Sequence, residues 1–409
     1  MPTLINNYKK SSPILLVAVM IYMLIIICPI VDLYMPWYLT LLPVCVMMLY
    51  LCNEKSNLLR AVNILLIGIV LTLFQHWFIF KRQDLLLFII NGIITWISCI
   101  VAVLCCSKIK LESQKRILQF ALVAMAITSI TTILGLQVYP RASRELASAT
   151  EEVRNVYMSL NIGGFEFIYA LVLSIPVVFW MIKQTKGLTK LINVVILIIF
   201  LYCIYLSAYT TALLISIVIL LLLMYDTLPR LRATIIITIV VFFVMAGSGA
   251  LSSIFMWLSS AVESEYVSDR LLQIGLVLQG ESIEDINTDT TNERLLLMKN
   301  AWEGFLSSPI WGNNLISWHK DILSGHSLGL DILSSAGLMG LMFFISMFYK
   351  VYKKIFSRRF KDLVFNTQIV WIGFICLSII NPSSFSIIYL VVFTLSSIVD
   401  NCNNANLKI

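Results

Sequence analysis

The stretch PILLVAVMIYMLIIICPIV, from Pro13 to Val31, runs for 19 residues without a charged side chain. An α-helix rises about 1.5 Å per residue, so roughly 20 apolar residues cross the hydrocarbon core of a bilayer. The stretch is longer than the apolar part of a secretory signal peptide, and we see no small-residue cleavage site after it. It therefore predicts a retained transmembrane helix near the N-terminus.

Similar apolar runs recur along the whole chain of 409 residues, which is 59% hydrophobic and only 12% charged. Soluble domains carry about 25% charged residues, so a chain of soluble domains is excluded. Backbone groups inside lipid need internal partners, which favours helices, and the runs lack the alternation of a β-barrel. The sequence predicts an all-α, polytopic bundle of about 12 transmembrane spans.

The distribution of charge predicts the orientation of these spans. With the N-terminus inside, the cytoplasmic segments hold 20 of the 29 Lys and Arg residues but only 5 of the 22 acidic ones. This asymmetry follows the positive-inside rule, and it places both termini in the cytoplasm. The net charge of +7 thus reports membrane orientation, and it gives no reason to expect nucleic acid as a partner. The assigned cytoplasmic segments are 1–12, 53–60, 107–116, 183–190, 226–232, 350–362 and the tail.

The same topology divides the chain into three parts. Residues 1–251 hold the first nine spans and an outer loop at 140–163, and residues 328–409 hold the last three spans and a cytoplasmic tail. Residues 252–327 form one large outer loop, which we expect to be ordered and partly helical. Loops of more than about 15 residues are usually functional or disordered. Within the large loop, Thr290 and Glu293 form a capping-box pattern for a helix reaching Leu306.

The sequence offers no metal site or disulfide framework. None of the nine cysteines falls in the large outer loops, and neither CxxC nor HExxH occurs. The acidic run at 281–289, ESIEDINTD, is irregularly spaced and lacks the glycine of a calcium loop, so we interpret it as a solvated loop. We therefore expect no metal and no cofactor.

The stretch GHSLGLDILSSAGLMG at 325–340 places a histidine where the large loop re-enters the membrane. In a helix starting at His326, Gly337 lies about 20° and Gly340 about 40° from the direction of the histidine, with Gly329 nearby. Glycines let a neighbouring helix approach closely, and histidine exchanges protons near neutral pH. Two interpretations stay open: ordinary helix packing with an interfacial histidine, or a positioned catalytic base.

Several outer arginines run against the positive-inside trend. Arginine binds phosphate through a planar fork of donors, but each of these residues also has outer carboxylates within sequence reach as ordinary ion-pair partners. The group comprises Arg141, Arg144, Arg154, Arg270 and Arg294.

Arg294 differs from the others because of its place on the predicted helix. It shares a face with Met298, Ala301 and Phe305, so a charge lies on an apolar face that is expected to point inward. A buried anionic partner or a snorkelling side chain explains such a position. Glu166 lies just inside the sixth span, a costly place for a carboxylate, and we expect it to pair with an arginine of the first outer loop.

Three segments carry a resemblance to one family. His326-Ser327, nine residues, and then Gly337-Leu338-Met339-Gly340 resembles the His-[Asn/Ser/Gln]-x9-Gly-x-x-Gly pattern of the O-antigen ligase and polymerase superfamily. Residues 292–314, NERLLLMKNAWEGFLSSPIWGNN, resemble its arginine helix with a following Pro-x-x-Gly turn. Residues 154–176 are similar to a loop-to-helix junction of polysaccharide polymerases. Nine residues separate Arg154 from Gly164, and Arg270 from Gly280, where some polymerases have ten.

The resemblance implies an integral membrane glycosyltransferase of the bacterial inner membrane, working on the periplasmic side in lipopolysaccharide biosynthesis. Such an O-antigen polymerase moves the growing glycan from undecaprenyl pyrophosphate to the non-reducing end of a new lipid-linked repeat unit. It implies a base at His326 and a pyrophosphate-stabilising group at Arg294. A chain-length regulator and a flippase of the same pathway are possible partners. Further candidates for binding the substrate are Arg270, Arg154, Arg144, Arg141 and Glu166.

Two other functions remain open. An O-antigen ligase transfers the glycan to the lipid A core with the same local motif, and GGFEFIYAL at 163–171 favours the polymerase only modestly. A transporter, such as the flippase, usually carries charged residues near the bilayer midplane and repeated halves. The predicted spans are almost free of such charges, which disfavours transport.

Overall fold

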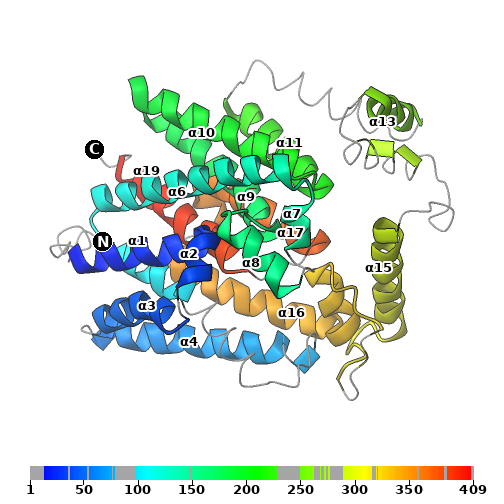
Figure 1. Ribbon diagram of the computed structural model, residues 1–409. Coiled ribbons are helices and arrows are strands. Elements are labelled where there is room, and N and C mark those ends of the chain that lie inside the picture. The colour runs from blue at the N-terminus through cyan, green and yellow to red at the C-terminus, as the bar shows by residue number, and fades with distance from the viewer. Residues whose placement is uncertain are drawn as a thin grey trace.

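The computed structural model shows a bundle of helices, with no β-strand in the ranges it describes (Figure 1). These ranges are 13–35, 37–52, 55–75, 77–78, 98–146, 150–227, 249–261, 268, 271–272, 275–276, 289–315, 319, 321–356, 359–381 and 385–406.

Within these ranges, five helical segments are long and apolar enough to cross a membrane. They are α6 (Leu111–Val138), α9 (Phe165–Gln184), α10 (Gly187–Leu206), the part Leu328–Lys353 of α16 (Leu328–Phe356) and the segment Ser386–Asn404. Shorter apolar helices accompany them, at Pro13–Ile27, Leu41–Cys52, Leu66–Gln75, Ser98–Lys108, Thr211–Thr227 and Phe365–Ile379.

The predicted all-α fold is therefore confirmed in the described ranges, which also contain the expected long apolar helices. The number of about 12 spans and their orientation stay predictions. The span expected near 232–251 lies almost entirely outside the described residues, and much of the large loop at 252–327 does as well.

Helix α9 forms the centre of the bundle. It packs against α10, α11 (Thr210–Thr227) and α17 (Phe365–Ile380), and its apolar side chains are buried on all sides (Figure 1). An all-round apolar helix is what a core position requires. The carbonyl of Pro176, inside this helix, accepts a hydrogen bond of 2.8 Å from the Asn366 side chain of α17.

The C-terminal helices complete the core. The short helix α18 (Ser386–Tyr389) continues through a π-helical turn, Leu390–Leu395, into α19 (Ser396–Asn406). Tyr389 and Phe393 stack with ring centroids 5.5 Å apart, and Phe348 of α16 and Trp371 of α17 pack against Phe393. This aromatic cluster ties α16, α17 and the C-terminal helices together.

The remaining helices fill the sides and one end of the bundle. Helices α13 and α15 lie beyond that end, away from α19 (Figure 1). The bounds are α1 (Pro13–Ile27), α2 (Pro29–Tyr34), α3 (Trp37–Cys52), α4 (Lys55–Gln75), α7 (Ala142–Glu145), α8 (Glu151–Ser159), α13 (Ala250–Ala261), α15 (Asp289–Ser307) and the 3-10 turn Phe360–Asp362.

The two ends of the bundle carry different connections. At one end Lys183 and Asp226 form an ion pair of 3.0 Å. At the other end, which we call the loop end, Tyr209 donates a 3.0 Å hydrogen bond to the carbonyl of Ser143, and Ser327 donates one to the carbonyl of Ile379. The segments that meet at each end are the ones that the charge distribution assigns to one side of the membrane. The compartment that each end faces stays a prediction.

Candidate functional site

The loop that enters α16 is held by its own side-chain hydroxyls. Ser327 caps the helix, because its Oγ accepts a 3.1 Å hydrogen bond from the amide of Leu330. The same hydroxyl donates to the carbonyl of Ile379, at the end of α17. The capped loop is thereby attached to two helices at once.

A buried carboxylate reinforces this loop. Asp331, in the first turn of α16, accepts two hydrogen bonds of 2.7 Å at Oδ1, one from the amide and one from the hydroxyl of Ser324. The Ser324 hydroxyl in turn accepts hydrogen bonds from the amides of His326, at 3.1 Å, and Ser327, at 3.0 Å. His326 is half-buried between these anchors.

The structure corrects the helical geometry that we expected from the sequence. The helix begins at Leu328, after His326, and it is interrupted at Gly337, which has φ 65° and ψ −166°. The expected angles from His326 to Gly337 and Gly340 assumed one unbroken helix, so they are wrong. The physical reason lies in a second segment that inserts at the break.

That segment is the turn at 308–314, which follows α15. Across the break, the amide of Leu338 donates to the carbonyl of Pro309 at 2.9 Å, and the amide of Met339 donates to that of Ile310 at 3.1 Å. In the other direction, the amides of Asn313 and Asn314 donate to two carbonyls shortly before the break, those of Ser334 and Ser335, at 3.1 and 2.9 Å. The turn thus satisfies the backbone groups that an interrupted helix leaves free.

Two glycines make this docking possible. A Cβ on Gly337 would lie 2.3 Å from the carbonyl oxygen of Ile310, and one on Gly312, which has φ 71°, would lie 2.3 Å from the backbone of Ser335. Gly340 follows the break and lies beside Ala336 and the ring of Phe74. Only residues without a side chain let the two backbones approach this closely.

Gly329 lies at an ordinary helix contact, unlike Gly337. A Cβ there would be 3.6 Å from Cα of Ile379 and from the carbonyl oxygen of Ser378, which is normal van der Waals distance. Among the three glycines singled out in the sequence, Gly329 therefore faces α17, while Gly337 and Gly340 lie at and after a helix break.

Helix α15 carries Arg294, and its extent agrees with the capping signals in the sequence. Of the face expected to point inward, Ala301 is buried, and Met298 and Phe305 are half-buried. The side chain of Arg294 lies outside the described residues. Its backbone is ten residues before Gly304, about 15 Å along the helix. A Cβ on Gly304 would lie 3.0 Å from Cβ of Ile322, so α15 contacts the loop that leads to His326.

The first loop is an ordered cap on the loop end of the bundle. Asn161, with φ 55°, accepts a 3.2 Å hydrogen bond from the amide of Ile30 and donates one of 3.0 Å to Thr131. Gly163 adds two more, because its carbonyl accepts from Ser143 at 2.7 Å and its amide donates to Thr132 at 2.9 Å. The loop and the start of α9 are thereby fixed to α6.

Arg154 lies on the exposed face of α8 and interacts electrostatically with two carboxylates, Asp32 of α2 and Glu166 of α9. The expectation that Glu166 forms a pair with an arginine of the first loop stays a prediction, for which Arg154 is the candidate partner. Arg141 is exposed and has an interaction partner. The side chain of Arg144 and the whole of Arg270 lie outside the described residues, so their predicted roles stay predictions.

A second carboxylate in the first loop binds a tyrosine. Glu145 accepts a 2.6 Å hydrogen bond from the phenol of Tyr157. This bond, with burial as the lesser cause, raises the pKa of Tyr157 above its usual value of 10. The hydrogen bond stabilises the protonated phenol and connects α7 to α8.

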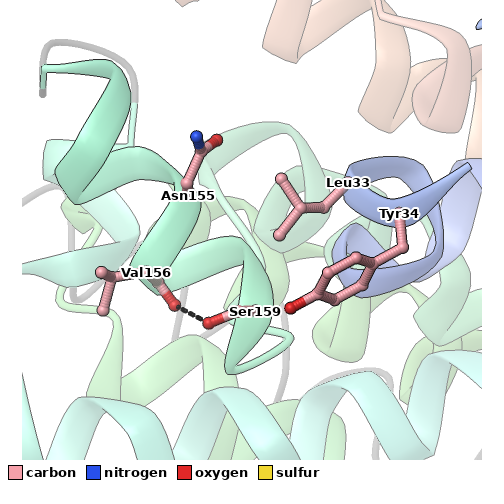
Figure 2. A pocket seen from close by; sticks show the side chains of 5 residues that line it. All are labelled: Leu33, Tyr34, Asn155, Val156 and Ser159. Carbon is pink, nitrogen blue, oxygen red and sulfur yellow. Dashed lines mark hydrogen bonds between the residues drawn. The ribbon is translucent and has the colours of Figure 1, made fainter. Parts of the chain in front are cut away.

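An open pocket of ≈ 370 Å³ lies between α2 and α8 (Figure 2). Its lining combines an exposed tyrosine with an amide and a hydroxyl, the latter donating a 2.7 Å hydrogen bond to the carbonyl of Val156. The lining residues are Leu33, Tyr34, Asn155, Val156 and Ser159.

The sequence analysis missed two acidic residues that the structure brings to the loop end, Asp331 and Asp32. The signal was available for Asp331, because a carboxylate within a predicted apolar span is costly and therefore marks a site with specific partners. Its partner, Ser324, was visible only once the loop had folded back on the helix.

Comparison with known protein families, with curated proteins and with solved structures gives no match to this chain.

Proposed function

We propose that this chain is a metal-independent membrane glycosyltransferase that polymerises a lipid-linked oligosaccharide, as an O-antigen polymerase does. The observation that carries the proposal is the position of His326. It sits in a capped, hydrogen-bonded loop at the loop end of the bundle, and the same loop contacts the arginine-bearing helix α15 where Ile322 meets Gly304. A titratable side chain on a fixed backbone is suited to general base catalysis.

In the proposed reaction, a hydroxyl of the acceptor sugar attacks the anomeric carbon of the donor glycan. The new carbon–oxygen bond forms as the bond to undecaprenyl pyrophosphate breaks, and the pyrophosphate leaves with the bonding electrons. His326 takes the proton of the hydroxyl, and the anomeric configuration inverts in this direct displacement. The acceptor is the non-reducing end of a new lipid-linked repeat unit.

Negative charge grows on the departing pyrophosphate, and a guanidinium stabilises it best because its fork of donors fits phosphate oxygens. We assign this role to Arg294, with Arg270, Arg144 and Arg141 as further candidates. Arg154 has two carboxylates as electrostatic partners, so we assign it first to holding Asp32 and Glu166 at the loop end.

The proposal also fixes a location. A lipid-linked donor requires the active site at the membrane rim, so we place the loop end in the periplasm and the protein in the bacterial inner membrane. Its working partners are then the flippase that delivers the repeat unit and a regulator of chain length.

The test compares two histidine variants in a strain that lacks the chromosomal copy. His326→Ala is expected to leave single repeat units on the lipid A core, because polymerisation stops while ligation continues. His319→Ala is the matched control, since this histidine is exposed in the same loop and its backbone amide, which the substitution keeps, donates to the Asn314 side chain at 2.8 Å. Lipopolysaccharide banding and membrane protein amounts are measured for both.

Other outcomes identify the alternative functions. Long glycan on the carrier lipid with a bare core indicates a ligase. Repeat units that stay on the cytoplasmic side indicate a flippase. Long chains of normal distribution in the His326→Ala strain would remove the catalytic role of this histidine, and with it the proposed mechanism. Purified protein with lipid-linked repeat unit alone should form polymer if the proposal holds.

A further inference from the structure

Asp331 is a carboxylate that the proposed chemistry does not use directly. Its side chain is only 4% exposed, and it lies in the first turn of a helix that is apolar enough to cross a membrane. Burying a carboxylate is costly unless hydrogen bonds satisfy it. Ser324 donates two hydrogen bonds to its Oδ1, and the backbone of Gly325 also donates to the carboxylate.

The direction of these hydrogen bonds follows from the chemistry of the groups. An ionised carboxylate only accepts, so the Ser324 hydroxyl must donate its single proton to Asp331. The lone pairs of that hydroxyl then face the amides of His326 and Ser327, which donate to it at 3.1 and 3.0 Å. Asp331 therefore determines how Ser324 is oriented, and Ser324 determines where the backbone of His326 lies.

The other side of the histidine has further contacts, to α16 and α17. Ser327 is fully buried, accepts from the amide of Leu330, and donates to the carbonyl of Ile379. Gly329 packs against the same end of α17 at ordinary van der Waals distance. His326 thus lies between two buried serines, one held by Asp331 and one held by α17.

We propose that Asp331 is a positioning residue that acts through Ser324 to hold His326 in its working orientation. The inference rests on the proposed function, because it concerns how the proposed base is aimed. An acidic residue in the first turn also stabilises a helix through its dipole, but that role needs no contact with Ser324. The two roles differ in what they do to turnover by correctly folded protein.

The experiment measures polymer formation by purified protein from lipid-linked repeat unit, in steady state, for the variants Asp331→Asn, Asp331→Leu and Ser324→Ala. Rates are expressed per folded molecule, with folding measured by thermal unfolding in detergent. The amide oxygen of Asp331→Asn still accepts hydrogen bonds from Ser324, so this variant is expected to keep kcat within about threefold of the unmodified protein.

Asp331→Leu keeps the approximate size but removes the acceptor, and Ser324→Ala removes the hydroxyl while keeping the carboxylate. Each is expected to lower kcat by roughly 10- to 100-fold, the effect of misplacing a reacting group by about 1 Å. KM for the repeat unit is expected to stay within about twofold, because the sugar contacts are unchanged. The double variant is expected to be no slower than the worse single one, since both act on the same contact.

Two outcomes overturn the inference. If folded Ser324→Ala and Asp331→Leu proteins turn over at the unmodified rate, the pair serves only folding. If their losses multiply in the double variant, they do not act through one another. Ser324→Ala decides the matter alone where Asp331→Leu does not fold.

His326→Ala in the same assay separates this inference from the proposed function. An inactive His326→Ala protein beside fully active Asp331 and Ser324 variants overturns only the positioning role. A fully active His326→Ala protein overturns the proposed catalytic role of the histidine, and a residue that positions it then has no catalytic meaning either.

Discussion

Gly337→Ala tests whether the break in α16 is a requirement of the fold. The glycine has φ 65° and ψ −166°, a region that is essentially restricted to glycine. Placing any other residue there costs on the order of 1–3 kcal/mol in backbone strain. The added Cβ would also lie 2.3 Å from the carbonyl oxygen of Ile310 and 2.7 Å from the amide nitrogen of Gly312, so backbone must move.

That movement separates the turn from α16. The hydrogen bonds from Leu338 to Pro309 and from Met339 to Ile310 are the ones next to the clash. Each contributes about 1 kcal/mol, so the total cost of the substitution is on the order of 3–5 kcal/mol. Folded proteins are stable by only about 5–15 kcal/mol, so the loss is a large share of the whole.

The assay is thermal unfolding of the purified protein in one detergent, together with the amount of protein that accumulates in the membrane. Gly329→Ala is the matched control, because its Cβ meets only ordinary contacts at 3.6 Å. This variant is expected to unfold at the same temperature as the unmodified protein or slightly higher, since alanine favours a helix by up to about 1 kcal/mol. Gly337→Ala with unchanged unfolding and accumulation would refute the reasoning.

Three further predictions concern α15 and the first loop. Arg294→Lys is expected to shorten the glycan at unchanged protein level, because an ammonium lacks the guanidinium fork, whereas Lys299→Arg on the exposed face of α15 leaves banding unchanged. Asn161→Gly keeps the left-handed backbone accessible but loses the side-chain hydrogen bonds. The free energy of unfolding is therefore expected to fall by about 1–3 kcal/mol, which lowers the unfolding temperature, and an unchanged temperature means that these bonds contribute nothing. The raised pKa of Tyr157 means that its stabilisation by Glu145 is present below about pH 10 and is lost as the pH rises through the folded pKa. Unfolding of the unmodified protein and Tyr157→Phe, measured from pH 7 to 11, is expected to converge at the high end, and a constant difference contradicts this.

Much of the fold was predictable because its determinants are local. Continuous apolar runs specify helices wherever they occur in lipid, and the capping pattern at Thr290 and Glu293 gave a helix to Leu306, where the structure has one from Asp289 to Ser307. The expected inward face of this helix at Met298 and Ala301 follows from the same 3.6-residue period.

The candidate site was less predictable, because its geometry depends on contacts between distant segments. A glycine pair three residues apart is compatible with an unbroken helix, and nothing local to Gly337 signals a break. The break is stabilised by a turn at Pro309 and Gly312, whose hydrogen bonds replace the missing helical ones. Likewise, Asp331 reads as an isolated acid in an apolar run until Ser324 folds back onto it.

The segment of α16 before the break, residues 328–336, is where these contacts meet. The histidine loop attaches to it through Asp331, the end of α15 attaches through Ser334 and Ser335, and α17 attaches through Gly329. A packed helix segment with satisfied hydrogen bonds moves as one body. The relative placement of the arginine helix and the histidine loop therefore depends on this one segment. A substitution that loosens either attachment, including one at Gly337, is then expected to disturb the positions of both His326 and Arg294.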